Sequence, residues 1–343
     1  MSETTLPAAA EARKKRRHWP PELNALIGLI GIAIIFEVLG WMVRDQSFFG
    51  SVVRLKIMIL QVSIIGIIAI GVTQVIITGG IDLSSGSIVG ATAMIAMSFA
   101  QVGTYEKAFF AEQGWTDLPV VVPIAIGLGC GLFAGFLNGV MIAYTRIPPF
   151  IATLGMMVSA RGVAKWWTKG KPVSFPTDDF AALGAGMTPV IIFIVIAVLF
   201  HLILKYTVYG KHTYAIGSNE DAARMSGINV EKHLVLVYSI AGLLAGVAAM
   251  VLSARGLTAQ SGMGVMYELD AIAMSVIGGV SLAGGRGSII GTTIGMVIFG
   301  VIISGFTFIR LDAFYQEMIK GAIIVGAVMA DVHRQKRRAA ESD

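Results

Sequence analysis

The chain has 343 residues, of which 55% are hydrophobic and only 14% are charged. Soluble proteins carry about 25% charged residues, so this composition excludes an ordinary soluble domain. The net charge of +5 does not indicate nucleic-acid binding, because the basic residues cluster at the ends of apolar runs, where membrane proteins place them. The expected fold class is all-α: a polytopic helical membrane protein in contact with lipid.

The N-terminal part of the chain predicts an uncleaved first span. A basic cluster at 13–17 precedes an apolar run at 24–43, and that run has the roughly 20 residues needed to cross a bilayer. No small-residue cleavage site follows it, as a signal peptide would require. We therefore expect residues 1–22 to form a basic cytoplasmic tail.

Apolar runs separated by polar breaks predict about ten transmembrane segments in a domain over 23–331. The segments are residues 24–43, 55–78, 86–101, 121–144, 150–168, 188–206, 234–254, 269–282, 287–305 and 313–331. Ten crossings place both chain ends on one side of the membrane. With cytoplasmic ends, the inner segments hold 15 Lys or Arg and the outer segments seven, as the positive-inside rule requires. The C-terminal tail, 332–343, is then cytoplasmic as well.

The polar stretch at 206–233 lies between two apolar runs and predicts a short cytoplasmic helix. Ser218 or Asn219 can cap its N-terminus, acidic residues follow in the first turn, and Gly227 can end it. A helix of about two turns, held at both ends by membrane spans, has little core of its own to bury. We therefore expect it to dock on another protein. An ordinary hydrophilic loop is the alternative interpretation.

Two glycine-rich breaks resemble each other. Residues 69–90 (AIGVTQVIITGGIDLSSGSIVG) and 271–291 (AIAMSVIGGVSLAGGRGSIIG) share Gly-Gly, Leu, Ser-Ile and a final Gly, and the neighbouring segments are short for full spans. Such interrupted segments at matching places in two halves point to a transport pathway, because broken helices need backbone that is buried in protein or lines a cavity. We expect two broken or re-entrant regions. The alternative is that Gly-rich turns look alike by chance.

Ionisable residues within the apolar runs are candidates for a pathway, because charge in the membrane is costly and usually functional. Asp82 can offer hydrogen bonds to a polyhydroxyl solute; alternatively it caps a helix that begins near Ser84. Glu317 and Lys320 have the i,i+3 spacing of a structural pair. The candidate pathway residues are Gly79, Gly80, Asp82, Ser84, Glu268, Asp270, Gly278 and Gly279.

Several kinds of catalytic site are missing from the sequence. No phosphate-loop motif G-x-x-x-x-G-K-[ST] occurs, so the chain is not expected to hydrolyse ATP. The five histidines are scattered without metal-ligand or nucleophile-triad spacing. The single cysteine, Cys130, cannot form an intramolecular disulfide. We predict no catalytic residue, no metal site and no cofactor in this chain.

The chain resembles the permease subunits of carbohydrate ABC importers of the ribose-transporter type. The matching stretches are residues 79–86 (GGIDLSSG), 215–228 (AIGSNEDAARMSGI) and 268–288 (ELDAIAMSVIGGVSLAGGRGS). They occur in the order of the family, and the similarity covers about 25–331. The chain departs from the family at Asp221, where Glu is usual, at Ser281, and in a longer loop at 102–120. The departures at Ser281 and in the 102–120 loop concern solute choice and the outer surface, while the class is unchanged.

The resemblance implies a homodimeric permease of the bacterial inner membrane that imports a monosaccharide or related polyol by alternating access. It also implies a separate cytoplasmic ATPase subunit, which would hold ATP and Mg, and a periplasmic sugar-binding protein. The loop that enters a groove on the ATPase would be formed by Gly217, Ser218, Asn219, Glu220, Asp221, Ala222, Ala223, Arg224 and Gly227.

The residues alone are also compatible with two other classes of function. A secondary transporter would couple the solute to H⁺ or Na⁺ through Asp82, Glu268 or Asp270. A channel or a membrane scaffold would show ATP-independent flux or none.

Overall fold

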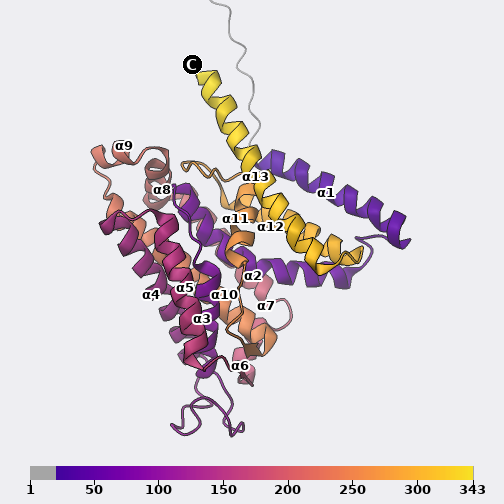
Figure 1. Ribbon diagram of the computed structural model, residues 1–343, viewed down its shortest axis with the longest axis vertical. Helices are drawn as coiled ribbons and strands as arrows, with labels where there is room; N and C mark the ends of the chain where they lie inside the picture. The colour runs from indigo at the N-terminus through magenta and orange to yellow at the C-terminus, as the bar shows by residue number, and fades with distance from the viewer. Residues whose placement is uncertain (1–20, 343) are drawn as a thin grey trace, which may run out of the picture.

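The computed structural model describes residues 21–342 (Figure 1). Its helices are α1 (Pro21–Arg44), α2 (Val52–Ile77), α3 (Ser85–Ser98), α4 (Val121–Thr145), α5 (Pro149–Trp167), α6 (Asp178–Ala181), the 3₁₀ helix η1 (Ala182–Gly184), α7 (Thr188–Tyr206), α8 (Val208–Ser218), α9 (Glu220–Met225), α10 (Val230–Gly256), α11 (Tyr267–Ile277), α12 (Ile289–Phe308) and α13 (Ala313–Ser342). The strands β1 (Val173–Ser174) and β2 (Thr258–Ala259) pair antiparallel. The predicted all-α fold is confirmed for the described residues.

Seven of the described helices are long and apolar enough to cross a membrane: α1, α2, α4, α7, α10, α12 and α13 up to His333. Each of the ten predicted segments overlaps a helix, but α3, α5 and α11 do not meet these criteria. With 14 and 11 residues, α3 and α11 are about 21 and 16 Å long, which is less than the ~30 Å hydrocarbon core. The count of ten spans is therefore not confirmed. α5 is long enough but carries Arg161 and Lys165.

The chain ends differ from the predicted tail boundaries. The basic cluster at 13–17 and residues 1–20 of the predicted N-terminal tail lie outside the described residues, as does residue 343. At the other end, α13 continues without a break past residue 331 to Ser342. The boundary predicted at 331 is a change in polarity within one helix.

The centre of the fold is made by α2 and α10. From Val62 to Ile77 every residue of α2 is buried, and α10 is buried over most of its length. On α4, the glycines at Gly131 and Gly135 face α10, where an added Cβ would overlap backbone atoms of Gly242 and Tyr238. Small residues allow such close approach of helix backbones in membranes.

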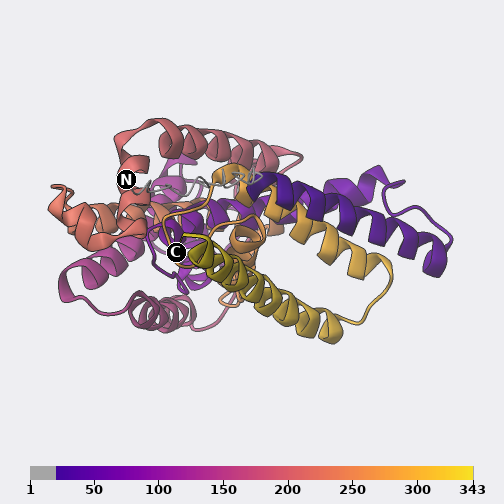
Figure 2. The same cartoon turned by 90° about the horizontal axis from the view of Figure 1, so that it is seen from above.

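A second, smaller cluster joins α1 to α12 at one side of the bundle. Phe36, Phe48 and Phe308 are buried in it, and the guanidinium of Arg54 lies 3.9 Å from the centre of the Phe308 ring. In Figure 2 the α1, α12 and α13 helices extend to one side of the remaining helices. The described part of α13 contributes no buried residue to its span.

The two ends of the molecule carry different structures. In Figure 1, α8, α9 and the end of α13 lie at the upper end, whereas the loop after α3 and α6 lie at the lower end. The loop at 169–187 is ordered: β1 within it pairs with β2, and Phe180 is fully buried. The helix α9, which lies in the expected coupling loop, is thus at the end opposite to the loop after α3 and to α6.

Candidate functional site

The short helix expected in the polar stretch is α9, and its caps explain its length. Of the two candidate N-caps the structure uses Asn219, whose Oδ1 accepts a hydrogen bond from the amide of Ala222 at 2.9 Å. At the C-terminus Gly227 has φ of +85°, and its amide and that of Ile228 donate to carbonyls of the last turn at 3.0 and 3.1 Å. This is a Schellman motif, which satisfies carbonyls that a helix end leaves free.

One buried residue fixes α9 to its neighbours. Ala223 is 4% exposed and packs with Ile216 of α8 and Val230 of α10, whereas Asp221, Ala222 and Met225 are exposed. A larger side chain at Ala223 would push α9 away from both helices. The opposite face of α9 is free to contact another protein.

Ion pairs hold the exposed side of the α9 region. Arg224 donates to Glu220 at 3.1 Å and to Glu231 at the start of α10 at 2.5 Å. The hydrogen bonds that Arg224 donates to these carboxylates, first the one to Glu231, raise the pKa of Arg224, so the guanidinium keeps its charge. Because the side chains are exposed, the pairs fix orientation more than stability.

Gly217 joins the end of α8 to both glycine-rich breaks. A Cβ at Gly217 would overlap the carbonyl oxygen of Ile77, the last residue of α2, and would lie 2.6 Å from the amide nitrogen of Gly285. The Gly285 amide in turn donates to the Ile77 carbonyl at 2.8 Å. Beside it, the Ser218 hydroxyl donates to the Tyr214 carbonyl at 2.8 Å. Only glycine fits at position 217 in this arrangement.

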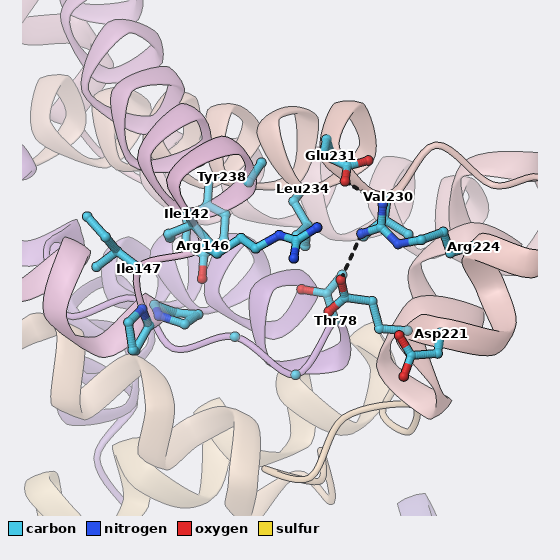
Figure 3. A pocket seen from close by; sticks show the side chains of 16 residues that line it. Thr78, Ile142, Arg146, Ile147, Asp221, Arg224, Val230, Glu231, Leu234 and Tyr238 are labelled. Atoms are coloured by element: carbon cyan, nitrogen blue, oxygen red, sulfur yellow. Dashed lines mark hydrogen bonds and ion pairs between the residues drawn. The ribbon is translucent and has the colours of Figure 1, made fainter.

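A cavity of about 380 Å³ separates α9 from the membrane helices (Figure 3). Its wall includes Asp221 of the expected coupling loop and Gly79 and Gly80 of the first break. Arg146, which ends α4, and Arg224 reach into the cavity from opposite sides in Figure 3. Two sets of residues that were predicted separately therefore meet around one space.

The resemblance between the two breaks has a local structural cause. α2 and α11 both end in a glycine at positive φ, Gly79 at +83° and Gly279 at +93°. In each case the amide of that glycine and the next amide donate to carbonyls of the last turn at 2.9 and 3.0 Å. Each break then leads to a serine at the start of the next helix, Ser84 before α3 and Ser288 before α12. The shared sequence pattern encodes one helix end and one helix start, used twice.

Other glycines of the breaks allow close packing. A Cβ at Gly278 would overlap the carbonyl oxygen of Gly291, which brings α11 against α12, and one at Gly80 would overlap the hydroxyl of Tyr238. The structure shows non-helical chain between α2 and α3 and between α11 and α12; re-entry into the membrane is not confirmed.

Asp82 is 1% exposed and does not face an open space. Its Oδ1 accepts from the amide of Ser84 at 2.8 Å and from the Ser84 hydroxyl at 2.6 Å. The Ser84 hydroxyl also accepts from the side-chain amide of Asn138 at 2.8 Å. This geometry supports the structural alternative for Asp82, in which it orders the start of α3.

The two carboxylates of α11 have different surroundings. Asp270 is 5% exposed and accepts from Lys320 of α13 at 3.5 Å, so Lys320 pairs with another helix and the predicted pair with Glu317 is wrong. Glu268 is 7% exposed, its carboxylate packs against Gly86, and its Oε2 has no hydrogen-bond partner among the described residues. Glu268 is thus the candidate whose bonding is incomplete.

Sequence reasoning missed three contributors to this region. Asn138 holds Ser84, Tyr214 donates from its hydroxyl to the Gly287 carbonyl at 2.8 Å, and Arg161 donates to the carbonyls of Ser261 and Met263 at 2.6 and 2.7 Å. The burial of the Tyr214 hydroxyl raises its pKa. A polar or charged residue within an apolar run was the available signal for Asn138 and Arg161.

The described residues hold no group of three or more His, Cys, Asp and Glu side chains that could bind a metal ion. What the arrangement can do is mechanical: it links one short exposed helix to the ends of several membrane helices.

Comparison with known proteins agrees with this interpretation. Residues 54–328 match the family described as branched-chain amino acid transport system / permease component. The ribose import permease protein of Escherichia coli is 37% identical over 326 residues, 92% of this chain and 95% of that protein. The ribose import permease protein of Bacillus subtilis is 37% identical over 94% of this chain and 97% of that protein.

A further relative is the galactose/methyl galactoside import permease protein of Haemophilus influenzae, 36% identical over 87% of this chain and 92% of that protein. No solved structure matches the chain. The matches confirm the resemblance seen in the sequence and the expectation of a permease subunit that is not itself an enzyme. By the extent of its match, the chain belongs to the family of branched-chain amino acid transport system permease components.

Proposed function

We propose that the chain is the transmembrane subunit of an ATP-binding-cassette importer that carries a monosaccharide or a related polyol across the bacterial inner membrane. The sugars in the names of its relatives, ribose and galactose, support this solute class. The observation that carries the proposal is the contact of Gly217 with both the end of α2 and the loop after α11.

In this proposal α9 is the coupling helix, and it receives force from a separate ATPase subunit that holds ATP and Mg. Its exposed face offers Asp221, Ala222 and Met225, with Met225 83% exposed. An exposed apolar side chain next to charged side chains suits binding in a groove on a partner protein. The cavity under α9 means that force reaches the membrane helices through the ends of α8 and α10, where Gly217 and Ala223 make contact.

Alternating access would follow from the contacts that link α8 and α9 to the two breaks. The last turn of α2, the loop after α11 and the end of α8 share backbone contacts, so displacement of α8 and α9 would move both breaks together. Gly79 and Gly279 end their helices at positive φ, and the chain beyond them is non-helical. The helices on either side of each break can then change their relative angle while each stays intact.

The remaining partners and the topology belong to the same proposal. Residues 23–331 would form the permease domain of a homodimer, with cytoplasmic tails at 1–22 and 332–343. A periplasmic sugar-binding protein would dock at the end opposite α9. The position of α9 and the end of α13 at one end of the molecule (Figure 1) supports a cytoplasmic C-terminal end. No cofactor is needed in this chain.

The test is uptake by proteoliposomes that contain the chain, its ATPase and its binding protein. D-ribose and D-galactose are the sugars to supply, with ATP enclosed on the α9 side. ATP-dependent uptake that persists in a protonophore is the expected result. Uptake that needs no ATP would contradict the proposal.

The second candidate is a transporter coupled to H⁺ or Na⁺. The observation that favours it is the unpartnered Oε2 of Glu268, since a proton or a cation could complete its bonding. Asp82 and Asp270 already have donors and are less suited to the role. Loss of uptake in a protonophore while ATP is maintained would favour this candidate.

A further inference from the structure

The outward face of α5 differs from the central part of α7 in carrying charge. From Ile191 to Leu202 the exposed side chains of α7 are apolar, including Ile194 at 51% and Val198 at 54% exposure. On α5, Val158 is 65% exposed, but Arg161 and Lys165 follow it on the same side one and two turns later. The α7 face suits lipid, whereas charge within the membrane is costly in contact with lipid.

These α5 residues form one wall of a cavity of about 400 Å³. Ser87 of α3 and Glu268 of α11 form the other side. Arg161 lies six residues before the end of α5, about 9 Å along the helix axis. Sites for small molecules have volumes of about 300–1,000 Å³, and this cavity lies in that range.

The cavity holds a carboxylate whose hydrogen bonding is incomplete. Glu268 is 7% exposed, and its Oε2 has no donor among the described residues. Ser87, which is 3% exposed, also lines the cavity. Arg161 by contrast is held by the carbonyls of Ser261 and Met263. A buried acceptor without a donor costs free energy, so the site is incomplete as it stands.

From these observations we infer that the cavity between α3, α5 and α11 is a water-filled contact site on the route of a neutral polyhydroxyl solute. Hydroxyl groups of the solute donate to the Glu268 carboxylate and accept from Lys165 and Ser87. An anionic ligand is disfavoured, because the Glu268 carboxylate lines the same space and Nη1 of Arg161 already donates to the carbonyls of Ser261 and Met263. The inference rests on the proposed function.

The site also constrains what covers the α5 face. Val158, Gly162 and Lys165 line the cavity and are exposed, so the cavity opens sideways on the surface. Water cannot persist there beside hydrocarbon without a protein cover. The second permease copy of the proposed homodimer supplies that cover.

The test measures the surroundings of single spin labels in the full chain. Cys130→Ser removes the only cysteine, and Val158→Cys or Val198→Cys then provides one attachment site in the cavity or on α7. Each labelled protein is placed in phosphatidylcholine vesicles, and the collision rates with oxygen and with the neutral, water-soluble nickel complex NiEDDA are compared. Oxygen concentrates in hydrocarbon, and the nickel complex stays in water.

We expect the ratio of nickel to oxygen collisions at position 158 to exceed that at position 198 by about threefold or more, because hydrocarbon excludes water. A label at 158 that meets oxygen but not nickel lies in lipid, and a label that meets neither lies in a dry interface; both results overturn the inference. This experiment needs no sugar, so it decides the point even if the proposed function fails.

A second measurement addresses Glu268 in the assembled importer. Glu268→Gln keeps a hydrogen-bond acceptor, whereas Glu268→Leu removes it. We expect Glu268→Leu to lower sugar carried per ATP hydrolysed by about fivefold relative to Glu268→Gln, the effect of roughly one neutral hydrogen bond. Equal ratios for the two variants overturn the role of Glu268. Absence of sugar uptake in the unmodified assembly would instead contradict the proposed function.

Discussion

The backbone amide of Gly285 donates to the carbonyl oxygen of Ile77 at 2.8 Å, although the two residues lie in different halves of the chain. The last carbonyls of a helix have no partner within it, and here the loop after α11 supplies one for α2. Gly217 lies against the same two groups. The end of α8 and both breaks therefore form one packed unit.

The first prediction concerns Gly217→Ala. In α8 this change should favour the helix by about 1 kcal/mol, but the new Cβ would overlap the Ile77 carbonyl. Overpacking of this kind costs about 1–3 kcal/mol, and the three contacting segments must separate. We expect ATP-driven uptake in proteoliposomes to fall severely.

The matched control is Gly129→Ala in α4, where an added Cβ meets nothing within 4 Å. It should keep uptake near that of the unmodified chain. If Gly217→Ala transports as well as Gly129→Ala, the contact at Gly217 does not transmit force.

The second prediction concerns the exposed face of α9. Glu220→Trp or Gly227→Trp should abolish ATP-linked uptake while insertion into the membrane survives. A bulky side chain at Glu220 obstructs docking, and any side chain at Gly227 is strained because φ there is +85°. Glu112→Trp, in an exposed loop at the other end, is the control and should leave uptake intact. Full uptake in both α9 variants would refute the coupling role.

Local features of this fold could be predicted from sequence, because their causes lie within a few residues. The N-cap at Asn219 and the C-terminal glycine at Gly227 specify α9 without help from the rest of the chain. The resemblance between the two breaks could be seen in the sequence for the same reason, since Gly79 and Gly279 end helices in the same way. Apolar runs similarly located the long helices.

Tertiary partners could not be predicted in this way. Lys320 has Glu317 at helical spacing, but the structure pairs it with Asp270, 50 residues away. Nothing near Gly217 in the sequence indicates its contact with Ile77. The count of ten spans is not confirmed, because α3 and α11 are short and an apolar run does not show where within it a helix ends. At the Gly-rich breaks, the residue at which a helix ends is set by the capping glycine.

The third prediction concerns the N-cap of α9. Asn219→Ala removes the acceptor for the Ala222 amide, and loss of such a cap costs about 1 kcal/mol. Hydrogen exchange of the α9 amides in the purified protein should therefore accelerate by about fivefold. Ser218→Ala is the control, since the Ser218 hydroxyl bonds within α8. Equal acceleration in the two variants would show that Asn219 does not cap α9.

The last prediction concerns the link between α11 and α13. Lys320 approaches Asp270 at 3.5 Å, with side chains 27% and 7% exposed. Lys320→Met keeps the apolar stem but leaves a buried carboxylate without its donor, which should destabilise the protein by about 1–3 kcal/mol. Adding Asp270→Asn removes the charge, so the double variant should recover part of the lost stability.

Thermal unfolding in detergent measures the stability of the single and double variants, with Lys336→Met on the exposed end of α13 as a control. If the single and double changes are additive within about 0.5 kcal/mol, the two residues are not coupled, and α13 is held to α11 by apolar contacts alone.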